Sequence, residues 1–306
     1  MTKDTLLKKF QFYLDRQDLS ERTIRGYLND LHYFQEWTAS IYGKPISLSH
    51  TNFSDLSAFR QSLLTAKRQK PAAINRRVQA LKRFFNWAHD KEIINENPAA
   101  KLRFIRRQAP KQPSSLTKIE VHQLLRIAGL SRKSLAERNY ALLQLVLQAG
   151  LRIGEVEKLQ MQDIQISSRS GVIRIVDGKG HKSREVPLNA TIRRALSTYF
   201  KQRKNIFPKQ PVFLTQQGTA MSLRSLQAVI SEIAKRTKIT RLFISAHTLR
   251  HTFATNYLKA NPGQLVELAA LLGHESLNTT AIYTKSSIDQ LAQAVEKSEI
   301  NIYDSE

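Results

Sequence analysis

Apolar residues recur every three to four positions through most of residues 1–105, which is the pattern of amphipathic helices. Four helices are expected there, over residues 5–17, 21–41, 54–67 and 72–91. Gly43 and Pro45 follow the second of these, and both residue types are common where helices end. A last short turn begins at Asn97. The pattern therefore predicts a helical first domain.

Residues 106–116 interrupt the periodicity and contain two prolines, two serines and three cations. Such a composition is typical of an inter-domain linker, here basic enough to lie along a phosphate backbone. Helical periodicity resumes at Thr117, which with Glu120 has the sequence of a capping box. Residues 138–148 are apolar on nearly every side, so they are expected to form the central buried helix of the second domain. A new helix opens after Gly150.

Between residues 163 and 188 the period changes from helical to alternating. Three short strands are expected, around residues 164–166, 172–176 and 184–188, joined by turns at 168–171 and 177–182. The chain then returns to helix over residues 190–204, 222–236, 246–259, 263–272 and 277–283. The predicted fold is mainly α with a small antiparallel β-sheet: a helical domain over 1–105, a linker over 106–116 and an α+β domain over 117–306.

Charge indicates the partner. The 306 residues include 48 Lys and Arg against 25 Asp and Glu, which gives a net charge of +23. The excess is spread over both halves, with 21 basic and 10 acidic residues before position 117 and 27 basic and 15 acidic residues after it. A long polyanion made of phosphates and gripped by two domains fits this distribution.

Other features exclude several classes of protein. No run of eighteen apolar residues occurs, so no membrane span or membrane partner is expected. The first residues lack the apolar stretch of a secretion signal, so the protein is expected to stay in the cytoplasm. The absence of cysteine fits this compartment and excludes disulfides and thiolate metal sites.

The stretch from Lys67 to Arg83, on the last helix of the first domain and the turn before it, carries seven cations and no acid. We interpret this run as a DNA-facing surface rather than an ordinary solvated face. Its members are Lys67, Arg68, Lys70, Arg76, Arg77, Lys82 and Arg83.

Candidate chemistry lies in the second domain. His247 and Arg250 are three residues apart on a predicted helix capped by Ser245, so they share one face. An imidazole can move a proton near neutral pH, and a guanidinium can bind two phosphate oxygens at once. Arg152 opens a helix after Gly150, where helix N-termini favour anions. Glu155, three residues later, either orients this arginine or only complements the helix dipole.

Two further stretches of the second domain carry candidate catalytic residues. Lys179 lies between two glycines, which let a turn approach a backbone closely. His274 is followed nine residues later by Tyr283. Taken alone, Lys179 would be a flexible turn residue and Tyr283 a core aromatic. His247 and His251 have the spacing of a helical zinc pair, but Thr248 stands where such a motif carries glutamate, so no metal site is expected.

These motifs resemble those of the tyrosine recombinases, the family of phage integrases and Xer-like chromosome-dimer recombinases. They are Ala-Gly-Leu-Arg-Ile-Gly-Glu at 149–155, Gly-Lys-Gly-His-Lys-Ser-Arg at 178–184, His-Thr-Leu-Arg-His at 247–251, Leu-Gly-His-Glu-Ser at 272–276 and Thr-Thr-Ala-Ile-Tyr at 279–283. Order and spacing match across residues 117–290, and residues 1–105 resemble the family's core-binding, SAM-like domain. Ala246 stands where the family often has proline, which leaves the side-chain roles intact.

The resemblance implies a metal-independent and ATP-independent enzyme that needs no cofactor. Tyr283 would attack a DNA phosphodiester and leave a 3′-phosphotyrosine and a free 5′-hydroxyl, and neighbouring cations or His247 as general base would assist the loss of its proton. Arg152 and Arg250 would bind the non-bridging oxygens, and His274 would donate a further hydrogen bond to the phosphate. Lys179 would protonate the leaving 5′ oxygen.

The resemblance also implies an assembly. The protein would be a monomer in solution and a homotetramer on two duplexes with paired inverted half-sites, its two domains forming a clamp around DNA. The tail, residues 284–306, keeps a weak apolar stripe and would pack on a neighbouring protomer. A type IB topoisomerase-like enzyme and a catalytically inactive DNA-binding relative are the alternatives. The start of the chain, close to the first helix, favours a simple site over a large integrative complex.

Overall fold

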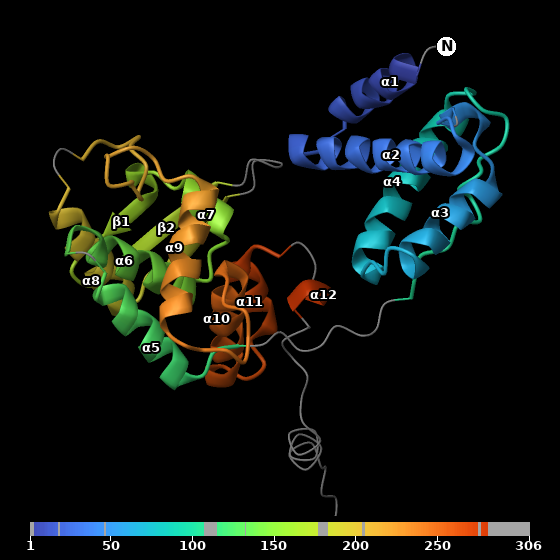
Figure 1. Ribbon diagram of the computed structural model, residues 1–306. Coiled ribbons are helices and arrows are strands. Elements are labelled where there is room, and N and C mark those ends of the chain that lie inside the picture. The colour runs from blue at the N-terminus through green and yellow to red at the C-terminus, as the bar shows by residue number, and fades with distance from the viewer. Residues whose placement is uncertain are drawn as a thin grey trace, which may run out of the picture. The chain divides into compact units, whose positions relative to one another are not determined.

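The structure, a computed structural model, describes residues 3–17, 19–45, 47–106, 115–131, 133–176, 183–203, 206–274 and 277–280. The chain divides into two compact units, residues 1–109 and 110–306, each with its own core (Figure 1). Within the described residues, no helix has the length and apolar character needed to cross a membrane.

The first unit consists of helices, as predicted. They are α1 (Lys3–Asp15), α2 (Glu21–Tyr42), α3 (Phe53–Thr65) and α4 (Pro71–Asp90), with a short 3₁₀ turn, η1 (Leu48–His50), that was not predicted. Helix α2 packs against the other three. Edge-to-face aromatic pairs hold this core: the rings of Phe34 and Phe59 are 5.1 Å apart between centroids, and those of Phe10 and Phe84 are 5.2 Å apart. All four of these rings are buried.

The second unit is built around α6 (Lys133–Ala149). This helix packs against α5 (Lys118–Gly129), α8 (Ala190–Lys201) and α10 (Ala246–Ala260), and its Leu142, Leu143 and Val146 are fully buried. The prediction of a central buried helix is confirmed. The remaining helices are α7 (Ile153–Lys158), α9 (Leu223–Arg236), α11 (Leu265–Leu272) and α12 (Leu277–Thr280), with the 3₁₀ turn η2 (Met161–Asp163).

The sheet has three antiparallel strands in the order β1 (Ile164–Ile166), β2 (Gly171–Val176) and β3 (Ser183–Pro187). Ile173 of the central strand pairs with Ile164 on one side and Val186 on the other. The predicted fold class, mainly α with a small antiparallel sheet, is thus confirmed. The turn at 177–182 lies outside the described residues.

Two glycines redirect the chain close to the candidate residues. Gly150 follows α6 with φ +64°, and a Cβ there would overlap the Phe253 ring of α10. Gly273 ends α11, also with φ +64°, and a Cβ there would lie 2.6 Å from a guanidinium nitrogen of Arg184. Both positions require glycine for conformation and for space. They bring the start of α7, the start of α10 and the end of α11 together.

Candidate active site

Three arginines surround the carboxyl end of α11. Each guanidinium donates to a different main-chain carbonyl oxygen at 2.8–2.9 Å: Arg184 to Leu271, Arg250 to Leu272 and Arg152 to Gly273. The last carbonyls of a helix lack partners within the helix and carry partial negative charge, which attracts cations. Residues from β3, α10 and the start of α7 therefore meet at one helix end.

Glu155 of α7 joins two of these arginines. Its carboxylate accepts hydrogen bonds from both terminal nitrogens of Arg184, at 3.0 and 2.8 Å, and from Nη1 of Arg152, at 3.0 Å. It also accepts the main-chain N–H of Arg152 at 2.8 Å. Burial alone would raise the pKa of Glu155, but the hydrogen bonds and charges of Arg184 and Arg152 outweigh it and lower the pKa. An ionised Glu155 is the group expected to orient Arg152.

Arg250 is the most deeply placed of the three, with 5% of the residue exposed. Its Nη1 donates to the carbonyl oxygen of Gly150 at 2.7 Å, and its Nη2 lies 3.0 Å from Nε2 of His274. Since a guanidinium has only donors, this imidazole nitrogen must act as the acceptor. Arg152, by contrast, has 39% of its side chain exposed and is accessible to a ligand.

His274 is held from both sides of its ring. Its Nδ1 lies 2.7 Å from Oγ1 of Thr280, a fully buried residue at the end of α12. Burial, together with the charges of Arg250, Arg152 and Arg184, lowers the pKa of His274 to about 4. The ring is therefore neutral at pH 7 with one proton. Because Nε2 accepts from Arg250, that proton is on Nδ1 and is donated to Thr280.

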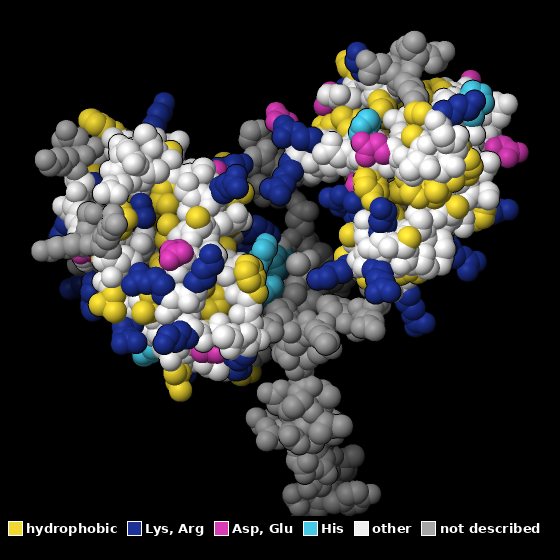
Figure 2. Space-filling model, in the orientation of Figure 1, with side chains coloured by type: hydrophobic (Ala, Val, Ile, Leu, Met, Phe, Trp, Pro, Cys, Tyr) yellow, Lys and Arg dark blue, Asp and Glu magenta, His cyan; other side chains and the backbone are white. Residues whose placement is uncertain are grey.

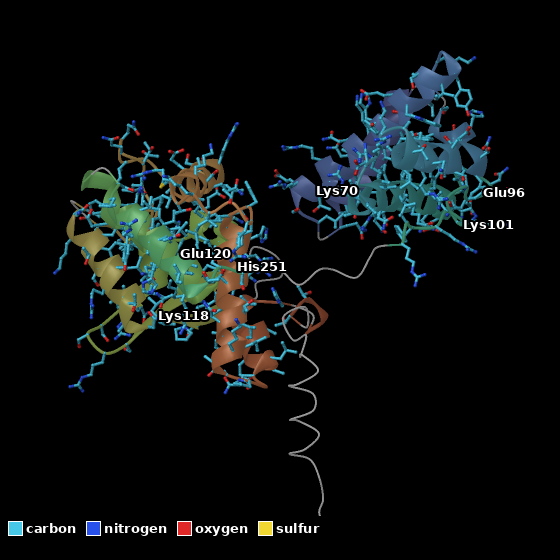
Figure 3. The ribbon with its side chains drawn as sticks, turned by 60° about the horizontal axis from the view of Figure 1, so that its bottom comes forward. Lys70, Glu96, Lys101, Lys118, Glu120 and His251 are labelled. Carbon is cyan, nitrogen blue, oxygen red and sulfur yellow. The ribbon has the colours of Figure 1, made fainter. Side chains whose placement is uncertain are left out.

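His247 and His251 lie one turn apart on α10, where Figure 3 labels His251. His247 is exposed, and the two ring centroids are 6.2 Å apart. Ser245 caps the helix as predicted, accepting from the main-chain N–H of Thr248. Burial, His247 and Arg250 lower the pKa of His251. In the part of the chain that the structure describes, no three His, Asp or Glu residues cluster as metal ligands.

The predicted catalytic residues are thus described in part. The structure brings Arg152, Arg250 and His274 together and places His247 one turn before Arg250 on the same helix. Lys179 and Tyr283, together with the tail at 284–306, lie outside the described residues.

Two residues of this site received no role from the sequence. Arg184 and Thr280 both stand inside the motifs quoted above, so the motifs themselves carried a signal. The partners of Arg184 are Glu155 and the end of α11, and both are far from Arg184 in the sequence. The main-chain acceptors at residues 271–273 have no side-chain signature, so no sequence pattern announces them.

The seven cations of the first unit fall into two groups. Lys67, Arg68 and Lys70 are exposed in and after the turn before α4, where Figure 3 labels Lys70. The others have partners inside their own unit. Arg76 pairs with buried Asp30 at 2.7 Å, and Lys82 Nζ donates to the carbonyl oxygens of residues 99 and 100.

Arg77 and Arg83 also face their own unit. The Arg77 guanidinium lies 4.6 Å from the centroid of the Tyr33 ring and donates to Gln69 at 2.7 Å. That of Arg83 lies 5.5 Å from the Tyr27 ring. The later cations of the run therefore stabilise their own unit. The exposed cations at its amino end, Lys67, Arg68 and Lys70, are called the basic patch below.

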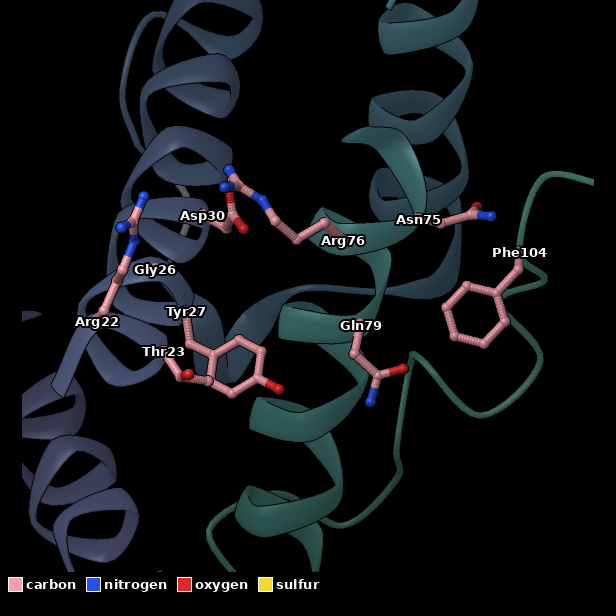
Figure 4. Close-up of a pocket in the computed structure, with 9 residues that line it drawn as sticks. All are labelled: Arg22, Thr23, Gly26, Tyr27, Asp30, Asn75, Arg76, Gln79 and Phe104. Atoms are coloured by element: carbon pink, nitrogen blue, oxygen red, sulfur yellow. The ribbon is translucent and has the colours of Figure 1, made fainter. Parts of the chain in front are cut away.

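A cavity of about 710 Å³ lies between α2 and α4. Figure 4 shows Arg76 of α4 reaching across to Asp30 of α2, with Tyr27 and Gln79 further along the same opening. Arg22 also lines it. Lys and Arg side chains outnumber Asp and Glu on the visible face of both units (Figure 2). This cavity, which Arg22 and Arg76 line beside the rings of Tyr27 and Phe104, is like the basic patch a candidate for contact with nucleic acid.

Comparison with known sequences identifies the family. The profile of the phage integrase family matches residues 114–289, more than half of the chain, and that of the phage integrase N-terminal SAM-like domain matches residues 7–92. Tyrosine recombinase XerD of Listeria innocua is 31% identical over 284 residues, 89% of this chain and 91% of that protein. Tyrosine recombinase XerC of Oceanobacillus iheyensis is 29% identical, covering 96% of this chain and 94% of that protein.

Solved structures agree. The XerH site-specific recombinase bound to its difH substrate, in a pre-cleavage complex, is 25% identical with a TM-score of 0.72, covering 90% of this chain and 79% of that one. The Tn1549 transposon integrase in complex with a circular intermediate DNA has a TM-score of 0.77 over 97% of this chain and 99% of that one. At 20% identity, this second likeness shows the fold alone.

Fold and relatives together define an enzyme of site-specific recombination. The chain belongs to the phage integrase family of tyrosine recombinases. The relatives named above are recombinases, so the topoisomerase-like and inactive alternatives are not favoured.

Proposed function

We propose that this recombinase cuts and rejoins two double-stranded DNA sites through a 3′-phosphotyrosine on Tyr283. The observation that carries the proposal is the meeting of Arg152, Arg250 and His274 at the end of α11. Guanidinium groups gathered in this way can donate to phosphate oxygens and stabilise the charge that develops on them in the transition state.

Each step then has a group to perform it. The Tyr283 oxygen attacks phosphorus while its proton passes to His247, and the bond to the 5′ oxygen breaks as Lys179 protonates that oxygen. Arg152 and Arg250 bind the non-bridging oxygens, the former from its exposed position at the start of α7. The phosphotyrosine preserves the energy of the phosphodiester, and the reverse reaction with a new 5′-hydroxyl seals the strand. No metal, cofactor or ATP enters this scheme.

The assembly belongs to the same proposal. A monomer in the cytoplasm would bind DNA as a clamp, with the basic patch at Lys67, Arg68 and Lys70 on the phosphate backbone. Four copies would join two duplexes, each with paired inverted half-sites. Residues 284–306 would pack on the next protomer, and a closed ring would follow from the geometry of the duplexes.

A covalent-adduct assay tests the chemistry. The purified chain is incubated with fragmented genomic DNA, protein-linked DNA is isolated after denaturation, and the sequenced 3′ ends give the target site. We expect adducts at one short inverted repeat, and none with Tyr283→Phe, which removes only the hydroxyl. Tyr257→Phe, in which a tyrosine on α10 loses its hydroxyl, is the matched control. An adduct formed by Tyr283→Phe would disprove the assignment of the nucleophile.

A further inference from the structure

The contact between His274 and Thr280 raises a question of proton placement. With Arg250 donating to Nε2, the neutral ring carries its proton on Nδ1 and donates it to Thr280 Oγ1 at 2.7 Å. A ring in this form presents a lone pair at Nε2. It can accept from an arginine there, but it cannot donate to a phosphate oxygen.

Phosphate binding requires the opposite arrangement. If Arg250 turns toward a phosphate oxygen, Nε2 loses its donor and faces the same phosphate, so two acceptors would oppose each other. Adding a second proton to the ring would solve this. The surroundings resist it, since burial and three arginines keep the pKa of His274 at about 4. Moving the single proton from Nδ1 to Nε2 solves it without adding charge.

That move needs a partner on the other side of the ring that can reverse its role. A hydroxyl is both donor and acceptor, so Oγ1 of Thr280 accepts from Nδ1–H in one state and donates to bare Nδ1 in the other. Thr280 is fully buried and is the partner that the structure gives to Nδ1, so its hydroxyl is the group placed to fill both roles. An unpartnered buried nitrogen would be costly.

We propose that Thr280 is a positioning residue that lets His274 exchange tautomers, from Nδ1–H paired with Thr280 in the free protein to Nε2–H donated to the phosphate in the DNA complex. The ring loses one proton to water and takes one back at the other nitrogen, so no net charge moves. This inference rests on the proposed function. It adds Thr280, three residues before Tyr283 in the sequence, to the residues on which the site depends.

Nitrogen NMR of the histidine rings tests the exchange directly. The chain is labelled with ¹⁵N-histidine in a Tyr283→Phe background, which prevents cleavage, and the signal of His274 is assigned by its loss in His274→Gln. We expect a protonated Nδ1 in the free chain and a protonated Nε2 after addition of a duplex carrying the mapped half-site. The same tautomer in both states would overturn the proposal, as would a ring protonated at both nitrogens.

Cleavage rates test the part of Thr280. Thr280→Val keeps the shape and removes the hydroxyl, and we expect single-turnover cleavage of the mapped site to slow by roughly 10- to 100-fold, in line with a misplaced catalytic group. Thr280→Ser restores the hydroxyl and should restore most of the rate. In a His274→Gln background, Thr280→Val should change the rate little further, since Thr280 acts through His274.

The outcomes separate this inference from the proposed function. An adduct that persists in Tyr283→Phe would disprove the proposed function and with it this inference. If Tyr283 is the nucleophile but Thr280→Val cleaves at the parent rate, only the role of Thr280 fails. Equal loss in Thr280→Val and Thr280→Ser, or additive losses with His274→Gln, would mark Thr280 as a packing residue. If Thr280→Val does not fold, the NMR result on the threonine-containing chain decides the question.

Discussion

At the scale of single residues, the site places charged groups according to the work each must do. Arg250 is nearly buried and is held by two carbonyl oxygens and an imidazole, whereas Arg152 is partly exposed. Hydrogen bonds from a buried guanidinium to main-chain carbonyls also stabilise the fold, whereas a partly exposed guanidinium contributes less to stability. The two arginines should therefore respond differently to the same substitution.

Arg250→Lys should lower cleavage by at least about 100-fold, because an ammonium cannot present two fixed donors to a phosphate. It should also destabilise the second unit, since one ammonium at that position cannot satisfy both carbonyl oxygens that the guanidinium reaches from Gly150 and Leu272. Arg152→Lys is the matched control: a comparable loss of cleavage with a much smaller change in thermal stability. Single-turnover cleavage and thermal unfolding measure the two effects, and equal stability of both variants would contradict this account.

Histidine burial predicts an acid-sensitive fold. The pKa of His274 is about 4 in the folded chain and 6.5 for an ordinary histidine, so between these values the unfolded chain binds more protons. Stability from this group is therefore present above pH 6.5 and is lost as pH falls toward 4. The lowered pKa of His251 acts in the same direction. The melting temperature of His274→Gln should fall less steeply than that of the parent across this window; parallel curves would exclude His274 as a contributor.

Residue types could be predicted from the sequence, but their partners could not. The motif order was enough to select Arg152, Arg250 and His274 as neighbours. The guanidiniums of Arg152 and Arg250 donate to main-chain carbonyls because of the path of the backbone around α11, which no side-chain pattern encodes. Thr280 was passed over for a similar reason, because a threonine in a short helix is unremarkable until its partner is known.

At the scale of elements, periodicity was a sufficient guide. Apolar spacing predicted the four helices of the first unit and the three strands of the second to within a few residues, because in each case one face is buried against a neighbour. The basic run on α4 was interpreted less completely. Asp30, the acid that pairs with Arg76 and lies near Arg77, is on α2 and far away in the sequence. The local absence of acids was therefore misleading.

The division of the seven cations into an exposed group and a paired group makes a prediction for the basic patch. Lys67→Ala should leave folding unchanged, weaken DNA binding similarly on any sequence and reduce the salt dependence of binding by about one ion. Arg77→Ala is the counterpart. It removes a side chain only 15% exposed that packs on Tyr33, so it should destabilise the first unit by roughly 1–3 kcal/mol. Binding titrations at several salt concentrations and denaturant unfolding measure these effects; an unfolding defect in Lys67→Ala would contradict the assignment.

At the scale of the whole molecule, the positive charge of both units and the acid-poor site favour a reaction run by cations of the protein itself. We expect cleavage of the mapped site to be unchanged in excess EDTA. The adduct assay, run with and without chelator, measures this. Loss of cleavage that added magnesium restores would refute the metal-free scheme.

The tail, which lies outside the described residues, supplies the other prediction at this scale. Ile288, Leu291 and Val295 recur at helical spacing in a segment too short to form a stable helix alone, so they need a surface to cover. Deleting the chain from Ile288 onward should leave half-site binding intact and abolish cooperative assembly and recombination. Gel-shift and strand-exchange assays decide it. A truncated chain that recombines at the parent rate would show the tail to be dispensable.

The use of main-chain carbonyls to hold the arginines has a consequence for how this site can change over generations. A carboxylate partner disappears with a single nucleotide substitution, but a peptide carbonyl is present whatever side chain occupies the position. The identities of Leu271 and Leu272 can therefore drift within the limits of packing while Arg184 and Arg250 keep their anchors. Substitution is tolerated least at Gly150 and Gly273, because a side chain there would alter the path of the backbone and move the carbonyl oxygens that hold the arginines.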